Sequence, residues 1–162
     1  MKIIWAPWRA KYISEIKKTK NCFICEAVKS TNDKESLVVF RGNLAIVIMN
    51  RYPYNIGHMM VSPMRHIKYP YEMTEEEMTE TMLLMAKMTK VLENLYSPEG
   101  INIGVNIGKS AGAGEEHLHF HIVPRWHGDT NFITVLDNTR VLPSSLESTY
   151  DKIKKEFENS KT

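Results

Sequence analysis

The sequence predicts an α+β fold built on an antiparallel sheet. Short apolar segments rich in β-branched residues are separated by glycine-containing turns, which is typical of strands joined in hairpins. One long segment between them instead repeats its apolar residues at spacings of three and four, which is typical of an amphipathic helix. Hairpin-paired strands with helices inserted between them form antiparallel sheets that carry helices on one face.

The length predicts one domain. A chain of 162 residues that is 43% hydrophobic can bury one well-formed core and is short for two. We therefore expect a single domain over residues 1–162. Its parts are an N-terminal segment, 1–30, with a Cys-x-x-Cys pair, a core, 31–126, and a C-terminal extension with a helix, 127–162.

Three strands are expected in the first half of the core. The segment "SLVVF" (36–40) and the run "LAIVIMN" (44–50) flank the turn "RGN" and form a predicted hairpin. The segment "HMMVSP" (58–63) follows the turn "RYPYNIG" and is the third strand.

A long helix is expected next. Thr74 and Glu77 have the spacing of a capping box, and Pro98 with Gly100 ends the helix after about 22 residues. A stripe of apolar residues follows its helical repeat, namely Met78, Met82, Met85, Met88, Leu92 and Leu95. We interpret this stripe as a buried core face rather than a flexible binding groove.

Two strands and a last helix complete the predicted fold. The segment "INIGVNIG" (101–108) alternates apolar residues with polar or small ones and predicts a strand. The segment around "HLHFHIV" (117–123) continues this alternation as a further strand. Ser144 and Glu147 then cap a final helix that runs to about Asn159.

Three of the six histidines alternate in the second of these strands. Side chains two residues apart point to the same face of a strand, so His117, His119 and His121 share one face while Leu118, Phe120 and Ile122 pack behind it. A strand face that is simply exposed to solvent would explain a single histidine, but it explains three alternating histidines poorly. Imidazole suits nucleophilic, acid–base or metal chemistry near neutral pH, and this pattern favours such a role.

A glycine-rich loop precedes the histidines. In "NIGKSAGAGEE", Gly108, Gly112 and Gly114 lead into the strand, and such loops let backbone N–H groups converge on phosphate oxygens. Together with the histidines, the loop indicates a phosphorylated substrate attacked by an imidazole nitrogen. Neighbouring histidines on one face can also share a zinc ion, so a metal remains an alternative at this level.

Composition excludes several classes of function. Lysine and arginine number 21 against 19 acidic residues, with no basic block, so we expect no nucleic-acid partner but allow a small anionic ligand. No segment reaches the roughly 20 apolar residues of a membrane span, and "MKIIWAPWRAKYI" lacks the apolar run of a secretory signal. We expect a cytoplasmic protein without a membrane partner and without an organic cofactor.

The two cysteines form the pair "CFIC". Cys22 and Cys25 have the spacing that lets two thiolates bind one tetrahedral zinc ion, but the pair supplies only half of such a site. In a reducing compartment the alternatives are an unoccupied reduced pair and a redox pair.

These motifs together resemble a known family. "HLHFHIV" resembles the signature of the histidine triad family of nucleotide hydrolases and transferases, and "IVIMNRYPYNIGHMMVSPMRH" resembles its nucleoside-binding strand, turn and strand. "PRWHGDTNFI" and the N-terminal "IWAPWRAKYI" are similar to the bacterial diadenosine polyphosphate phosphorylase-like branch. The resemblance implies a histidine triad (HIT-like) fold whose sheet extends across a homodimer.

The resemblance also implies roles for individual residues. His119 would attack the α-phosphate to give a nucleotidyl-histidine, and His121 would donate a hydrogen bond to that phosphate. Asn50 would contact the ribose and Asn106 the phosphate region. An apolar wall would hold the base, formed by Phe40, Ile46 and Ile48. Trp126 either packs in the core or faces a base or acceptor.

The resemblance implies two further metal ligands, whereas two other histidines are interpreted from the sequence alone. His66 and His117 would complete a structural zinc site with Cys22 and Cys25. His58 is interpreted as a partly buried structural histidine and His127 as exposed.

The loop before the triad departs from the family pattern. Many relatives carry glutamine followed by serine or threonine there, whereas this chain has Ala113 and Gly114. Backbone groups of Gly112 to Gly114, or Ser110, would then bind the phosphate, with positive charge from Lys109 and Arg125.

The sequence therefore predicts an enzyme that cleaves a dinucleoside polyphosphate of the diadenosine tetraphosphate type at the α-phosphate, with inorganic phosphate as acceptor. Hydrolysis of such substrates or of nucleoside phosphoramidates is the alternative chemistry. A non-catalytic nucleotide-binding, zinc-stabilised interaction module is the alternative of another class.

Overall fold

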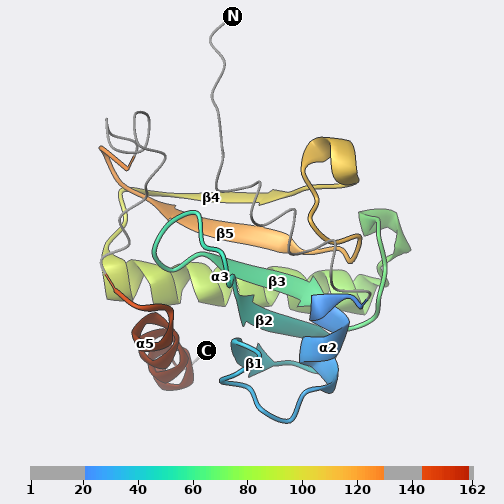
Figure 1. Ribbon diagram of the computed structural model, residues 1–162, viewed down its shortest axis with the longest axis horizontal. Coiled ribbons are helices and arrows are strands. Elements are labelled where there is room, and N and C mark those ends of the chain that lie inside the picture. The colour runs from blue at the N-terminus through green and yellow to red at the C-terminus, as the bar shows by residue number, and fades with distance from the viewer. Residues whose placement is uncertain (1–20, 130–143, 161–162) are drawn as a thin grey trace, which may run out of the picture.

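The computed structural model describes residues 21–129 and 144–160, and its centre is one five-stranded antiparallel sheet (Figure 1). The strand order is β1-β2-β3-β5-β4, and each neighbouring pair is antiparallel. The strands are β1 (Val38–Arg41), β2 (Ala45–Met49), β3 (Met59–Pro63), β4 (Gly100–Val105) and β5 (Phe120–Arg125). The predicted α+β class and antiparallel sheet are confirmed.

In the described part of the chain, three α-helices and two short 3-10 helices accompany the sheet. They are α2 (Phe23–Lys29), α3 (Glu75–Tyr96), α5 (Leu146–Asn159), η1 (Pro70–Glu72) and η2 (Lys109–Ala111). The capping box of α3 is confirmed, because the Thr74 hydroxyl accepts from the Glu77 N–H while Glu77 accepts from the Thr74 N–H. The cap of α5 is Ser145 rather than the predicted Ser144, whose hydroxyl instead pairs with Thr149.

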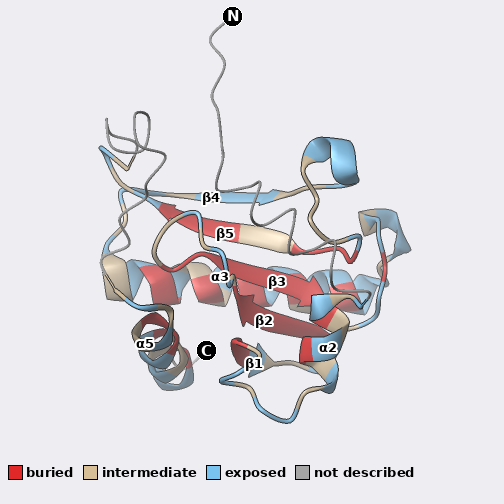
Figure 2. Ribbon diagram, in the orientation of Figure 1, coloured by how far each residue is buried: buried red, intermediate tan, exposed pale blue. Residues whose placement is uncertain are grey.

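Helix α3 runs across one face of the sheet, and α5 lies beside α3 and β1 (Figure 1). The side of α3 that faces the sheet is buried (Figure 2) and includes Met85, Met88 and Leu92. The predicted core stripe is wrong at its start, since Met78 is 44% and Met82 62% exposed. These two residues of α3 lie outside the side of the helix that packs on the sheet.

The central strands are buried along their whole length. Every residue of β2 and β3 is buried, and α3 covers one face of these strands (Figure 2). The turn between β2 and β3 ends at Gly57, whose φ of 74° favours glycine. A Cβ there would also lie 2.9 Å from the Leu92 side chain of α3.

The histidine segment is only partly a strand. Strand β5 begins at Phe120, so His117 and His119 precede it, and the expected single strand through all three histidines is wrong. The preceding segment is nevertheless held against β3. The Ser62 hydroxyl donates to the Leu118 carbonyl at 2.7 Å, and the Leu118 N–H donates to the Ile67 carbonyl at 2.7 Å.

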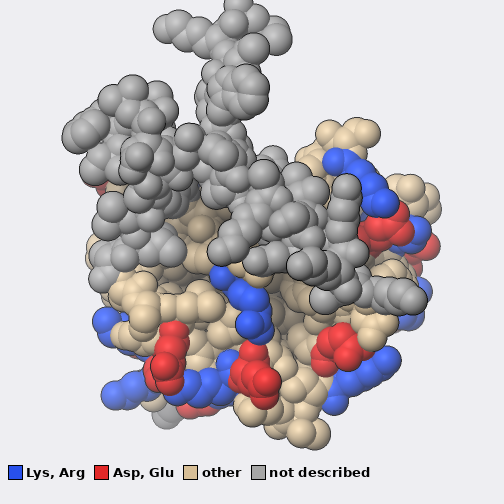
Figure 3. Space-filling view, in the orientation of Figure 1, with Lys and Arg blue, Asp and Glu red and all other residues tan. Residues whose placement is uncertain are grey.

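Charges of both signs are interspersed over the described part of the face seen in Figure 3. Among the described residues, no helix has the length and apolar character needed to cross a lipid bilayer. The motif "IWAPWRAKYI" and the end of "PRWHGDTNFI" lie outside the described residues.

Candidate functional site

His119 is held in one orientation by the backbone. Its Nδ1 lies 2.7 Å from the carbonyl oxygen of His117, and because a carbonyl only accepts, Nδ1 carries the proton and donates. The Nε2 lone pair of neutral His119 is therefore available for attack. Burial lowers the pKa of His119, which is 5% exposed, so the ring is neutral at neutral pH.

His121 is oriented by His58. The backbone N–H of Tyr54 donates to His58 Nδ1 at 3.1 Å, which places the His58 proton on Nε2. That nitrogen lies 2.9 Å from His121 Nδ1 and donates to it. The proton of neutral His121 is then on Nε2. Burial, followed by repulsion from His119 when that ring is protonated, lowers the pKa of His121 to about 4.

His58 is the site residue whose role the sequence interpretation missed. It is fully buried, as a structural histidine would be, but its ring contacts the triad directly. The register explains the contact, since Met60 pairs with His121 and His58 lies two residues before Met60 on the same face. The contact could not be predicted without knowing that β3 pairs with β5.

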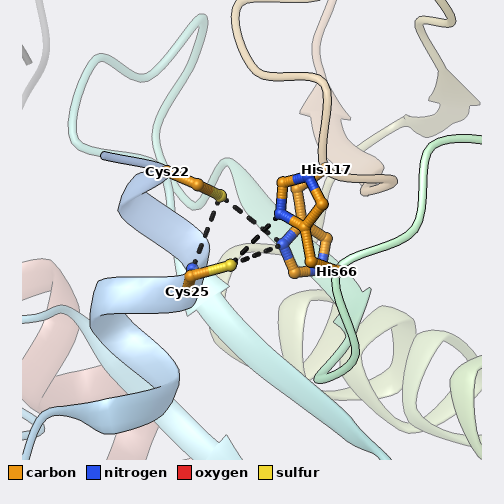
Figure 4. Close-up of side chains that lie close together, drawn as sticks. All are labelled: Cys22, Cys25, His66 and His117. Carbon is orange, nitrogen blue, oxygen red and sulfur yellow. Dashed lines mark hydrogen bonds between the residues drawn. The ribbon is translucent and has the colours of Figure 1, made fainter. Parts of the chain in front are cut away.

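A second cluster lies beside the triad (Figure 4). Cys22 and Cys25, at the start of α2, point toward the rings of His66 and His117, and the four possible ligand atoms lie within 4.8 Å of one another. His117 Nδ1 is 3.5 Å from each sulfur, and His66 Nδ1 is 3.2 Å from Cys25 Sγ. The structure therefore brings together all four predicted metal ligands.

The donor set fits zinc. With zinc–ligand bonds of about 2.0–2.3 Å, a tetrahedral ion needs ligand atoms roughly 3.3–3.8 Å apart, close to the three sulfur–nitrogen distances of 3.2–3.5 Å. His117 Nε2 donates to the Pro63 carbonyl at 2.9 Å, which leaves the Nδ1 lone pair directed at the cysteines. Burial lowers the pKa of His117 to about 4 and keeps it neutral.

The Cys22 thiol needs a cation to ionise. Burial raises the pKa of Cys22 to about 12, so the group is protonated at neutral pH without a cation. A bound zinc ion would displace that proton, which makes metal binding pH-dependent. His66 is the exposed member of the cluster and gives it one face toward solvent.

The predicted nucleoside contacts are only partly assembled. The Asn50 amide nitrogen lies 3.5 Å from His58 Nε2, next to the triad, and Asn106 directly follows β4. Ile48 pairs with Met60, on the His121 face of the sheet. Phe40 packs instead against Phe157 of α5, with ring centroids 4.9 Å apart.

Phe40 and Ile48 consequently lie on opposite faces, and the structure does not bring them into one wall. A register shift between Val38 and Phe40 places Phe40 opposite Val47. Ile46, like Ile48, is buried and faces the His121 side through its pairing with Ser62.

The glycine loop has the expected position but not the expected donors. Lys109 and Ser110 lie in η2, and Gly114 follows it. The N–H groups of Gly112 and Ala113 donate to the carbonyls of Lys109 and Gly108. These two amides are therefore already used within the loop and do not converge on a common point.

The end of β5 lies away from the nucleophile. Arg125, expected to supply positive charge, instead donates to Asp129 and to Asn102 of β4, the latter at 2.8 Å. Trp126 follows the strand and its N–H donates to Asp129. His127 is exposed as predicted, with a side chain that is 97% exposed.

Comparison with known proteins agrees with this geometry. The family model described as "HIT domain" matches residues 31–128. The AP-4-A phosphorylase of Mycobacterium tuberculosis is 40% identical over 154 residues, covering 90% of this chain and 79% of the relative. The bis(5'-adenosyl)-triphosphatase of Dictyostelium discoideum is 33% identical over 92 residues, covering 57% of this chain and 62% of the relative.

A solved structure supports the fold. A zinc-bound histidine triad family protein from Mycobacterium smegmatis superposes with a TM-score of 0.69 at 21% identity, covering 86% of this chain and 94% of that one. With the family model matched from the first strand through the triad, and 40% identity to a relative over most of the chain, this protein belongs to the HIT domain family.

Proposed function

We propose that the protein cleaves dinucleoside polyphosphates at the α-phosphate through a nucleotidyl-His119 intermediate, with inorganic phosphate as the acceptor. The names of the relatives support this substrate class, since one is an AP-4-A phosphorylase and another a bis(5'-adenosyl)-triphosphatase.

The observation that carries the proposal is the set of proton positions on the histidines. His119 presents a lone pair at Nε2 because its Nδ1 donates to the His117 carbonyl. His121 presents an N–H at Nε2 because its Nδ1 accepts from His58. The ring centroids of His119 and His121 lie 4.8 Å apart, so a nucleophile and a hydrogen-bond donor occur side by side.

The proposed reaction has two displacements. In the first, His119 Nε2 forms a bond to the α-phosphorus while the bond to the bridging oxygen breaks, and the nucleoside polyphosphate leaves with that electron pair. His121 Nε2–H donates to the phosphoryl group and stabilises its charge. In the second, an acceptor oxygen attacks the same phosphorus, the P–N bond breaks, and His119 is restored.

The acceptor decides between two activities. Phosphate yields a nucleoside diphosphate, whereas water yields a monophosphate. The 40% identity to an AP-4-A phosphorylase favours phosphate. Hydrolysis remains the second candidate, because two loop amides and Arg125 are already bonded and so give a dianionic acceptor fewer donors.

We also propose a structural zinc ion bound by Cys22, Cys25, His66 and His117. Zinc would supply a cross-link between α2 and the segment before β5, and four protein ligands leave it no open position for substrate. His117 connects this site to the reaction, because its carbonyl accepts the hydrogen bond from His119.

A second copy of the chain is the proposed partner at β4. This strand is at the edge of the sheet, and its Ile103 is 52% exposed. Met82 and Leu83 of α3 are 62% and 65% exposed. Edge pairing of two β4 strands would extend the sheet across a homodimer. Light scattering is expected to give twice the chain mass at micromolar concentration, and a monomer would contradict this.

Product analysis tests the proposed activity. The protein is incubated with diadenosine tetraphosphate, with and without inorganic phosphate, and the nucleotides are separated. We expect ADP and ATP, at a rate that rises with phosphate. AMP and ATP at a rate independent of phosphate would show a hydrolase, and no cleavage under either condition would contradict the proposal.

A further inference from the structure

The corner between the β2–β3 turn and the end of β5 contains a buried carboxylate. The Asp129 side chain is only 4% exposed and is surrounded by donors. It accepts from the Asn55 amide at 2.9 Å, from the Trp126 N–H at 3.0 Å and from Arg125. Burying an ionised carboxylate is costly unless such partners are present, so these hydrogen bonds offset the cost of burying Asp129.

Asn55 joins the two segments. Its Nδ2 donates both to Asp129 and, at 3.1 Å, to the carbonyl of Pro124 in β5. Its own carbonyl accepts from the His58 N–H at 3.2 Å. We call this pair of residues the Asn55–Asp129 clasp. It connects the strand that carries His121 to the turn that carries His58.

The turn also sets the proton position on His58. The Tyr54 N–H, one residue before Asn55, donates to His58 Nδ1 and thereby keeps the proton on Nε2. If this donor moved away, the other tautomer of His58 would become accessible. His58 Nε2 would then be an acceptor, His121 would have to protonate its Nδ1, and the His121 Nε2 lone pair would face the substrate.

We propose that the Asn55–Asp129 clasp positions the turn so that His58 holds His121 in the tautomer that donates to the phosphoryl group. Asn55 and Asp129 are thus positioning residues rather than catalytic residues. The inference rests on the proposed function for its catalytic consequence, but the tautomers of His58 and His121 are measurable without turnover.

The test combines histidine NMR with steady-state kinetics. Long-range proton–nitrogen spectra of protein labelled with ¹⁵N-histidine report which ring nitrogen carries each proton. The wild type is expected to show Nε2-protonated His58 and His121. Asn55→Ala removes the link and leaves Asp129 paired with Arg125, so this variant is expected to fold.

Asn55→Ala should show mixed or exchanging tautomers at both rings. Its kcat for diadenosine tetraphosphate should fall about tenfold with little change in KM, because misplacement of a transition-state donor affects the chemical step. Asp129→Asn should behave similarly, because an amide in place of the carboxylate cannot accept from Asn55, the Trp126 N–H and Arg125 together.

Glu99→Gln is the matched control at the same corner, since Glu99 pairs with the exposed His127 and does not contact the clasp. It should change neither the spectra nor kcat. The proposal is overturned if folded Asn55→Ala keeps the wild-type tautomers, or if its kcat is unchanged while turnover is measurable. Absence of turnover in every variant would instead contradict the proposed function, and the spectra would still decide the clasp.

Discussion

At the scale of single residues, chemistry in this protein depends on where protons are placed. Each triad histidine has one ring nitrogen bonded to a partner that fixes the tautomer, namely the Pro63 carbonyl for His117, the His117 carbonyl for His119 and His58 for His121. In the proposed mechanism, the partner of each ring suits it to one role: metal ligand for His117, nucleophile for His119 and hydrogen-bond donor for His121. Burial keeps all three neutral near pH 7 by lowering their pKa values.

His121→Ala is expected to reduce kcat on the order of 10²-fold, the usual cost of one lost transition-state donor. KM should change little, since the hydrogen bond is strongest once charge develops on the phosphoryl group. Steady-state kinetics with diadenosine tetraphosphate measure this. A loss confined to KM would mean that His121 binds substrate without assisting the reaction.

The depressed pKa of His121 predicts a pH dependence of stability. The ordinary pKa is 6.5 and the folded value is about 4, so the unfolded chain binds this proton first as the pH falls. The free energy of unfolding should therefore decline from pH 6.5 toward pH 4.

His121→Gln removes this proton uptake. The free energy of unfolding of the variant should therefore decline less steeply than that of the wild type over the same pH range. Urea unfolding at several pH values between 4 and 7 tests this difference. Parallel curves for the two proteins would show that His121 does not contribute to the acid sensitivity.

At the scale of elements, side-chain bonds between segments place the functional groups. Helix α3 shows this at its first turn, where Glu77 is buried and accepts from the Thr74 N–H and from Arg65, which lies just before His66. The cap of the helix thus also anchors the segment that carries a predicted metal ligand.

Glu77→Gln should lower the free energy of unfolding by about 2 kcal/mol, because hydrogen bonds to charged partners contribute about 1.5–3 kcal/mol. The Arg65 hydrogen bond lowers the pKa of Glu77, so this contribution is present above the ordinary carboxyl pKa and is lost in acid. Urea unfolding at pH 7 measures the change. Glu76→Gln, on the exposed side of the same turn, should have little effect, and equal losses in both variants would contradict the account.

The sequence predicts local patterns better than contacts that depend on how the strands pair. The α3 cap and the Cys-x-x-Cys pair are local patterns, and the structure places their residues as expected. The histidine spacing is local too, but only His121 of the three lies in strand β5. Phe40 was assigned to the wrong face because a register shift after Val38 reverses the alternation of β1. His58 was interpreted without its partner because the pairing of β3 with β5 joins residues about 60 positions apart.

At the scale of the whole molecule, the hydrophobic core and the cysteine–histidine cluster meet at the histidine segment. The sheet with α3 and α5 forms the main core, and the Cys22–Cys25–His66–His117 cluster ties α2 to that segment. Because His117 belongs to the cluster and its carbonyl holds His119, the cluster and the nucleophile share one short piece of backbone.

Protein purified without chelator should contain about one zinc ion per chain, and removing it should lower the unfolding temperature. Cys25→Ser should lower zinc content and stability together. Elemental analysis and calorimetry test this expectation. Loss of activity on zinc removal with the fold unchanged would contradict a structural role, as would a native protein without zinc.

The central claim is that His119 becomes covalently nucleotidylated, and intact mass spectrometry after rapid quenching of the protein with diadenosine tetraphosphate tests it most directly. The quench must avoid acid, which cleaves the P–N bond. We expect the wild type to gain one adenylyl group, mapped to His119, which disappears when inorganic phosphate is added as ADP forms. His119→Ala should bind nucleotide, gain no adenylyl group and lose nearly all turnover. Turnover without any adduct, an adduct on another residue, or a tenth of wild-type activity in His119→Ala would contradict the account.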